Sequence, residues 1–177
     1  MGGLDSEKKL GEADACLADQ RKRLGDLEAE IELLAEMAGE FDGQTSNPEE
    51  EGFIEVLSNE IPEMREKLAE ATENCAKIDE QTKTTRAKIE DRKKKSGGDL
   101  KQEDLDEIAV DIATLEERVE KNEKGVNDLE RRVKAKKQRF LDMDVGKKLK
   151  RREKEIGELK KHVDEAAKEA AALEKEA

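Results

Sequence analysis

The 177-residue chain has no Trp, no Tyr and only three Phe, and 34% of its residues are hydrophobic. A compact globular core needs large apolar side chains, and this composition supplies too few of them. Long helices need less apolar area per residue, because each one buries only a narrow row of side chains. The abundance of Ala, Glu, Lys, Leu and Arg also favours helix, so the composition argues for long helices over a globule.

Cysteine is almost as scarce. Cys16 and Cys75 are 59 residues apart and lack the Cys-x-x-Cys spacing of redox and zinc motifs. We therefore expect neither a disulfide framework nor a zinc site, but small, buried, reduced thiols in a reducing compartment. A crosslink between the two residues is the alternative, since both lie on or beside predicted core positions.

Long hydrophobic runs and catalytic motifs are missing too. No run approaches the roughly 18 apolar residues that cross a membrane, and no signal-peptide core follows Met1, so we expect an intracellular, cytoplasmic protein. Glycine loops for phosphate, nucleophile elbows and metal-binding helix motifs are absent. We expect no enzyme activity, no catalytic residue, no cofactor and no metal.

Charge, in contrast, is abundant and unevenly distributed. Charged residues make up 46% of the chain, and the net charge is −12. Residues 1–60 hold 5 basic and 17 acidic side chains, whereas Arg131 to Arg152 contains 11 Lys or Arg against two Asp. The overall acidity disfavours nucleic acid as a partner.

Apolar residues recur at alternating steps of three and four, the heptad pattern of a coiled coil. Disorder would suit the charge content, but so regular a period favours helices. In the clearest row, Asn122 and Lys136 take core positions, and we interpret both as devices that set the register of the helices. The predicted core positions are Leu10, Ala13, Leu17, Gln20, Leu24, Leu27, Ile31, Leu34, Ala38 and Phe41, then Ile54, Leu57, Ile61, Met64, Leu68, Ala71, Cys75, Ile78, Thr82, Thr85 and Ile89, then Leu105, Ile108, Ile112, Leu115, Val119, Asn122, Val126, Leu129, Val133, Lys136 and Phe140.

The sequence thus predicts an all-α fold, a long antiparallel three-helix coiled-coil bundle with a projecting C-terminal helix. The bundle is expected to span residues 1–146, with helices at 5–41, 48–95 and 100–141, and residues 147–177 form a C-terminal helical extension. In outline this resembles a spectrin-type repeat with longer helices. Asn47-Pro48 is typical of a helix start and Ser96-Gly97-Gly98 of a helix end.

Two details of this arrangement can be tested. Pro62 is expected either to bend the second helix or to divide it, with Ser58 or Asn59 as the new cap. If the turns centre near residues 45 and 97, the numbers of facing residues add to about 90 and about 195 across the two helix pairs. This register places Cys16 level with Cys75, and gathers the three Phe at one end of the bundle.

The C-terminal extension repeats the heptad pattern without an obvious partner in the chain. Its apolar positions need another chain or must fold back, so we predict a partner-binding face at Leu149, Ile156, Leu159, Val163 and Leu173. The basic segment is a second candidate surface, for an acidic partner such as a filament, although it could instead neutralise the acids of the first helix. Its residues are Arg131, Arg132, Lys136, Lys137, Arg139, Lys147, Lys148, Arg151 and Arg152.

Two features near the N-terminus offer further hypotheses. Gly2, with Ser6 four residues later, matches the pattern for N-myristoylation, and only acylation would bring this chain to a membrane. Gly11, Gly25 and Gly39 recur every 14 residues, either as a smooth stripe for another helix or as glycines tolerated in a long helix.

We therefore predict a structural or interaction protein, a rigid helical linker or spacer that joins other helical or filament proteins in a cytoskeletal or axonemal type of assembly. An N-myristoylated coiled-coil adaptor at a membrane surface is the alternative.

Overall fold

The computed structural model describes the backbone of residues 2–43 and 47–176, and the side chains of residues 5–43, 47–143 and 151–175. Within these limits the chain is helical and contains no strand. Its four helices are α1 (Gly2–Phe41), α2 (Pro48–Lys95), α3 (Gln102–Asp142) and α4 (Asp144–Glu176). The predicted all-α class is confirmed.

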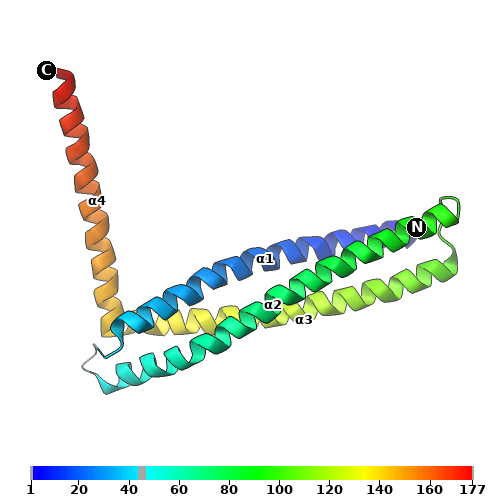
Figure 1. Cartoon of the computed structure of the whole chain (residues 1–177), viewed down its shortest axis with the longest axis horizontal. Coiled ribbons are helices and arrows are strands. Elements are labelled where there is room, and N and C mark those ends of the chain that lie inside the picture. The colour runs from blue at the N-terminus through cyan, green and yellow to red at the C-terminus, as the bar shows by residue number, and fades with distance from the viewer. Residues whose placement is uncertain (1, 44–46, 177) are drawn as a thin grey trace.

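Three of the helices form a bundle. Figure 1 shows α1, α2 and α3 side by side along their lengths, whereas α4 turns away from the end of the bundle where α1 finishes. The prediction of a bundle of three helices is confirmed. A single extended residue, Met143 (φ −75°, ψ 158°), separates α3 from α4.

The ends of α2 have the predicted chemistry. Asn47 caps its start, since the Asn47 side chain accepts a hydrogen bond from the Glu49 N–H at 3.0 Å, and Pro48 follows as the first helical residue. At the other end Gly97 and Gly98 have φ values of 71° and 112°, a region that side chains with a Cβ rarely adopt. Glycine is therefore required where the chain reverses towards α3.

Pro62 does not divide α2. The helix is continuous from Pro48 to Lys95 with Pro62 inside it, so the alternative of a second helix capped by Ser58 or Asn59 is wrong. Proline has no N–H, so the Ser58 carbonyl lacks its usual helical donor. The buried neighbours Ile61 and Met64 hold this part of α2 against the other helices despite that loss.

The heptad rows form the core. All ten predicted positions of α1 are buried, and in α2 and α3 only Leu68, Leu105 and Lys136 are half-buried rather than buried. Removing these apolar side chains from water stabilises the bundle by roughly 25 cal/mol for each Å² of apolar surface buried. A narrow row is thus enough to hold three long helices together.

One layer of this core is polar. Gln20 from α1, Cys75 from α2 and Asn122 from α3 meet there with 0%, 1% and 5% of their surfaces exposed. The Asn122 Nδ2 donates to Gln20 Oε1 at 2.9 Å, and Gln20 Nε2 donates to the Val119 carbonyl at 3.2 Å and to Glu123 Oε2 at 3.0 Å. A buried amide is stable only where it meets its hydrogen-bond partners, so the layer favours one register of the three helices.

The aromatic residues gather at one end of the bundle, as predicted. The rings of Phe41 and Phe140 have centroids 6.1 Å apart at an angle of 50°. Phe53 is buried nearby and lies beneath two cations, Arg139 at 4.7 Å and Lys136 at 5.6 Å from the ring centroid. The half-buried Lys136 therefore has an aromatic partner at its core position.

The expected register of α1 and α2 is wrong by about two to three helical turns. The numbers of ion-paired residues add to 100 for Glu7 with Lys93 and for Asp14 with Arg86, and to 97 for Glu32 with Arg65, rather than to 90. Since α2 begins beyond the level at which α1 ends, a turn centred at residue 45 was a poor guide (Figure 1). Between α2 and α3 the numbers add to 195 for Lys88 with Glu107, as expected.

The two cysteines differ in exposure. Both are free thiols, but Cys16 is exposed and only Cys75 is buried, so the expectation of two buried thiols is wrong for Cys16. Cys16 lies one position before a core residue, Leu17, and turns outwards. Burial raises the pKa of the Cys75 thiol above its ordinary value.

A double-mutant cycle tests the polar layer. Gln20→Leu or Asn122→Leu alone leaves a buried amide without its main partner, and we expect each to lower the free energy of unfolding by about 1 to 3 kcal/mol. The double variant replaces both amides by apolar side chains of similar size and is expected to match or exceed the wild type. Urea denaturation measures all four proteins, and purely additive losses would contradict the layer.

Thiol labelling tests the placement of the two cysteines. In native protein we expect Cys16 to react with an aromatic disulfide reagent at the rate of a free thiol, and Cys75 on the order of 100-fold or more slowly, because it is buried and its pKa is raised. Cys16→Ser should remove the fast phase and leave the slow one. Two fast thiols would show that Cys75 is not in the core.

Candidate functional site

The C-terminal helix carries the largest exposed apolar side chains outside the bundle. Ile156, Leu159, Val163 and Leu173 are exposed over 52%, 62%, 63% and 66% of their surfaces. Leu149, the fifth residue predicted for this face, lies outside the part of the chain whose side chains are described. These exposed apolar side chains make this face of α4 the candidate binding surface.

Helix geometry places these side chains on one face. The row continues through Ala166 and Ala170, both exposed, at the same steps of three and four. Ile156, Leu159 and Val163 line a shallow hollow on α4, bordered by Lys160 and Asp164. An apolar floor with one cation and one acid at its rim suits the side chains of another amphipathic helix.

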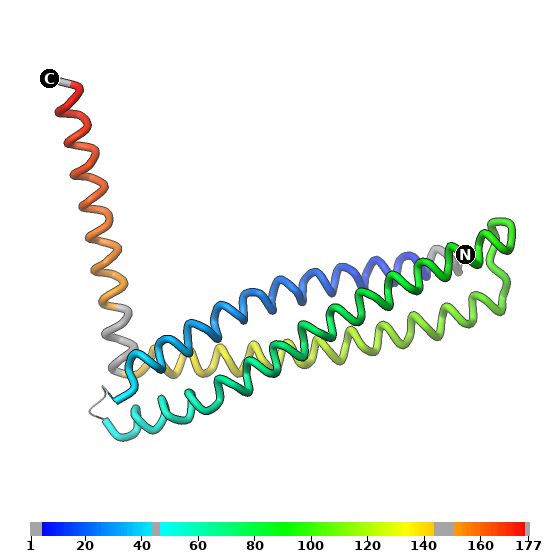
Figure 2. Tube along the Cα trace, in the orientation of Figure 1, coloured from blue at the N-terminus to red at the C-terminus, as the bar shows by residue number. Residues whose placement is uncertain are grey.

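The bundle holds α4 only at its base. Met143 packs partly buried against the core at the junction, and Arg152 pairs with Glu40 of α1 at 3.6 Å between Nη1 and Oε1. Figure 2 shows the rest of α4 extending clear of the other three helices. The apolar face of α4 is therefore not covered by the bundle over residues 156–173.

Three residues of the predicted basic surface pair with acids of other helices in the bundle. Arg132 makes a two-point contact with Glu63 at 3.0 and 3.2 Å, Lys136 pairs with Glu60 at 3.2 Å, and Lys137 pairs with Glu30 at 3.7 Å. The remaining predicted residues with described side chains, Arg131, Arg139, Arg151 and Arg152, are all exposed. Lys147 and Lys148 lie outside the residues whose side chains are described.

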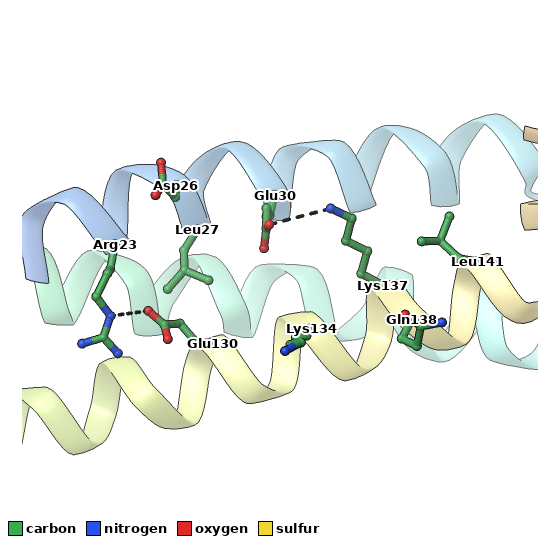
Figure 3. Close-up of a pocket in the computed structure, with 9 residues that line it drawn as sticks. All are labelled: Arg23, Asp26, Leu27, Glu30, Glu130, Lys134, Lys137, Gln138 and Leu141. Atoms are coloured by element: carbon green, nitrogen blue, oxygen red, sulfur yellow. Dashed lines mark hydrogen bonds and ion pairs between the residues drawn. The ribbon is translucent and has the colours of Figure 1, made fainter. Parts of the chain in front are cut away.

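A groove between α1 and α3 was not predicted from the sequence. Figure 3 shows its lining, with Arg23 reaching from α1 to Glu130 of α3 and Lys137 reaching back to Glu30. Its volume is about 420 Å³, and Leu27 and Leu141 supply its apolar part. Arg23 also donates to Glu123 and Asn127, which ties α1 to the surface of the polar layer.

The ion pairs hold their members in the charged form. The hydrogen bond to Glu130 raises the pKa of Arg23 above its ordinary value, and hydrogen bonds from Arg65 and Arg132 lower the pKa values of Glu32 and Glu63. Burial alone would raise the pKa of Glu123, but hydrogen bonds from Arg23 and Gln20 lower it overall. Carboxyl groups shifted in this direction stay ionised at neutral pH.

A second groove, between α2 and α3, is lined by four cations. Lys67 and Lys77 come from α2, Arg118 and Lys121 from α3, and Glu70 is the single acid of the lining. No pattern in the sequence predicted this groove, because these cations are scattered along two helices and meet only when α2 and α3 are in register. Lys77 pairs with Glu73 of its own helix at 3.4 Å.

The remaining features considered in the sequence are a membrane span, a metal site and a lipidation site. Among the residues described, no helix is long and apolar enough to cross a membrane, and no three His, Cys, Asp or Glu side chains gather as a metal site would need. His162 is exposed. Gly2, the candidate lipidation site, lies outside the residues whose surroundings are described.

The glycine stripe borders open space. A Cβ added to Gly11, Gly25 or Gly39 would meet no atom within 4 Å, so no described residue packs against the stripe. Each glycine therefore gives its helix conformational freedom in the unfolded state without a packing gain in the folded one.

Replacing Gly25 with Ala should therefore stabilise the protein by about 0.5 to 1 kcal/mol, the difference in helix propensity. Gly43→Ala is the matched control: its Cβ would also meet nothing, but its φ of 74° should make the same change destabilising. Thermal unfolding of both variants measures the effects. A loss of stability in Gly25→Ala would show that the stripe contacts something in solution.

Comparisons with protein-family models, with curated proteins and with solved structures each gave no match.

Proposed function

We propose that this chain is a structural protein, a rigid helical linker or spacer that joins components of a larger assembly of the cytoskeletal or axonemal type. It docks through α4, and the exposed basic residues near the base of α4 assist. The observation that carries this proposal is the row of exposed apolar side chains on a helix that leaves its own bundle.

The bundle provides the rigidity. We propose that it is an antiparallel coiled coil, with residues 1–146 as the bundle and 147–177 as the extension. The ion pairs support this arrangement, since between α1 and α2 rising numbers in one helix meet falling numbers in the other, as Glu7 with Lys93 and Glu32 with Arg65. The break at Met143 supports a division within a few residues of the proposed one.

The chemistry of the surface supports a binding role over catalysis. A general acid or base at neutral pH needs a carboxyl group whose pKa is raised or a cation whose pKa is lowered. The pKa values of Glu32, Glu63 and Glu123 are all lowered. The pKa values of Arg23 and Lys88 are raised. Such groups serve as fixed charges that align helices.

The basic residues supply the second half of the proposed contact. Arg131, Arg139 and Arg151 are exposed and lie towards the end of the bundle from which α4 leaves. An acidic filament surface would attract these cations, and the attraction would weaken with salt. Arg131, Arg132 and Lys137 contribute less than Arg139 and Arg151, because acids of the bundle already pair with them.

Sedimentation with microtubules and with actin filaments tests this function. We expect the full chain to pellet with one of these acidic filaments, and Val163→Glu to weaken the binding roughly ten-fold because it places a charge in the apolar row of α4. Val110→Glu on α3 is the matched control, since Val110 and Val163 are exposed over 65% and 63% of their surfaces. It should bind like the wild type.

Two other results would contradict the proposal. Pelleting that is unchanged after removal of residues 147–177, with the helix content of the truncated bundle checked by circular dichroism, would show that α4 has no docking role. Flotation of natively expressed protein with lipid vesicles, without filament binding, would favour the acylated adaptor instead.

A further inference from the structure

The charges of α4 are arranged against its own helix dipole. Residues 146–160 contain seven Lys or Arg and three Glu, whereas residues 162–176 contain two Lys and five Asp or Glu. A helix has a partial positive charge at its N-terminus and a partial negative charge at its C-terminus, so cations at the start and acids at the end are unfavourable. An isolated α4 is therefore destabilised by its own charge pattern.

We propose that α4 pairs in antiparallel orientation with α4 of a second copy of this chain. The inference rests on the proposed function and names the occupant of the apolar face of α4. The exposed basic residues near the base of each α4 are then the part of the pair that contacts the filament. In this arrangement the basic half of each helix lies beside the acidic half of the other, and each dipole lies beside one of opposite direction. Most of the charges that destabilise a single α4 then attract across the pair, with Glu155 beside Glu169 of the second copy as an exception.

The core positions fit an antiparallel pair. When the centre of the pair is near Lys161, Leu159 lies opposite Val163 of the second copy and Ile156 opposite Ala166 of the second copy. Arg152 lies opposite the small Ala170 of the second copy, which leaves room for its long side chain to reach water. Ile156 and Arg152 thus meet small side chains, which helps close packing. The other two layers pair Leu159 with Val163 and Leu149 with Leu173, which brings apolar side chains together.

A parallel pair would fit poorly. Each position would then lie opposite itself, so that the two copies of Arg152 would share one layer and the two copies of Ala166 would leave a gap in another. Two guanidinium groups in one apolar layer repel each other and lose hydration. The sequence of α4 therefore favours the antiparallel orientation.

The fold leaves space for a second copy. Figure 2 shows α4 standing clear of α1, α2 and α3 beyond its base, so a second helix can lie along it without meeting the bundle. The helix is 33 residues long, or about 50 Å at 1.5 Å per residue. A pair joined in this way carries one bundle at each end, which gives the proposed spacer two attachment points.

The mass of the protein in solution tests the pairing. Sedimentation equilibrium of the full chain is expected to show a dimer at micromolar concentrations that weakens with salt. Val163→Glu should give a monomer, whereas Val110→Glu, an equally exposed position on α3, should remain dimeric. A wild-type chain that stays monomeric at all concentrations overturns the inference.

Glu155→Lys tests the orientation. In the antiparallel pair residue 155 flanks Glu169 of the second copy, so the substitution replaces two repulsive contacts by attractive ones. The dimer dissociation constant should then fall roughly three-fold or more at low salt. In a parallel pair residue 155 would flank Lys160 of the second copy, so weaker dimerisation would overturn the antiparallel arrangement.

The two proposals fail separately. A monomeric chain whose binding to filaments still depends on Val163 overturns the pairing and leaves the docking role of α4 intact. A dimer that binds neither microtubules nor actin filaments supports the pairing and overturns the filament linker.

Discussion

The buried hydrogen bond between Gln20 and Asn122 is the constraint on which the rest of the bundle depends. Apolar heptad layers are nearly interchangeable, so three helices with regular rows could slide by seven residues and still bury them. The amide pair, with Cys75 beside it, fits in one register only, because a slide would leave two buried amides without partners. The surface ion pairs and the Phe41 to Phe140 contact follow from that register.

The contrast between the bundle and α4 gives the molecule its proposed role. In α1, α2 and α3 the apolar rows are buried against one another, and their charged flanks are paired across helices. In α4 the same kind of row faces water, and its charges suit a neighbour running in the opposite direction. A bundle whose apolar rows are buried, joined to one helix whose apolar row is exposed, is suited to linking other components.

The periodicity of the sequence predicted which residues are buried, but it did not predict how α1 and α2 are aligned. The heptad rows identified the buried positions and the polar exceptions Asn122 and Gln20, because burial of one helix face is a local property. The register of α1 and α2 was wrong by seven to ten residues, since a shift of one heptad preserves every apolar match. That error also placed Cys16 level with Cys75. Neutralisation of acids of the first helix by the basic segment was an expected alternative, and the pair of Lys137 with Glu30 agrees with it. The ion pairs of Arg23, and those of Arg132 and Lys136 with α2, depend on the register and were not predicted.

Hydrogen–deuterium exchange at several protein concentrations tests the central claim most directly, that the bundle is complete by itself and α4 is not. The account predicts slow exchange around Gln20, Cys75 and Asn122 at every concentration, and protection of residues 152–173 that rises as the protein is concentrated. Protection of α4 that does not change on dilution, or exchange near Gln20 as fast as in dilute α4, would contradict it.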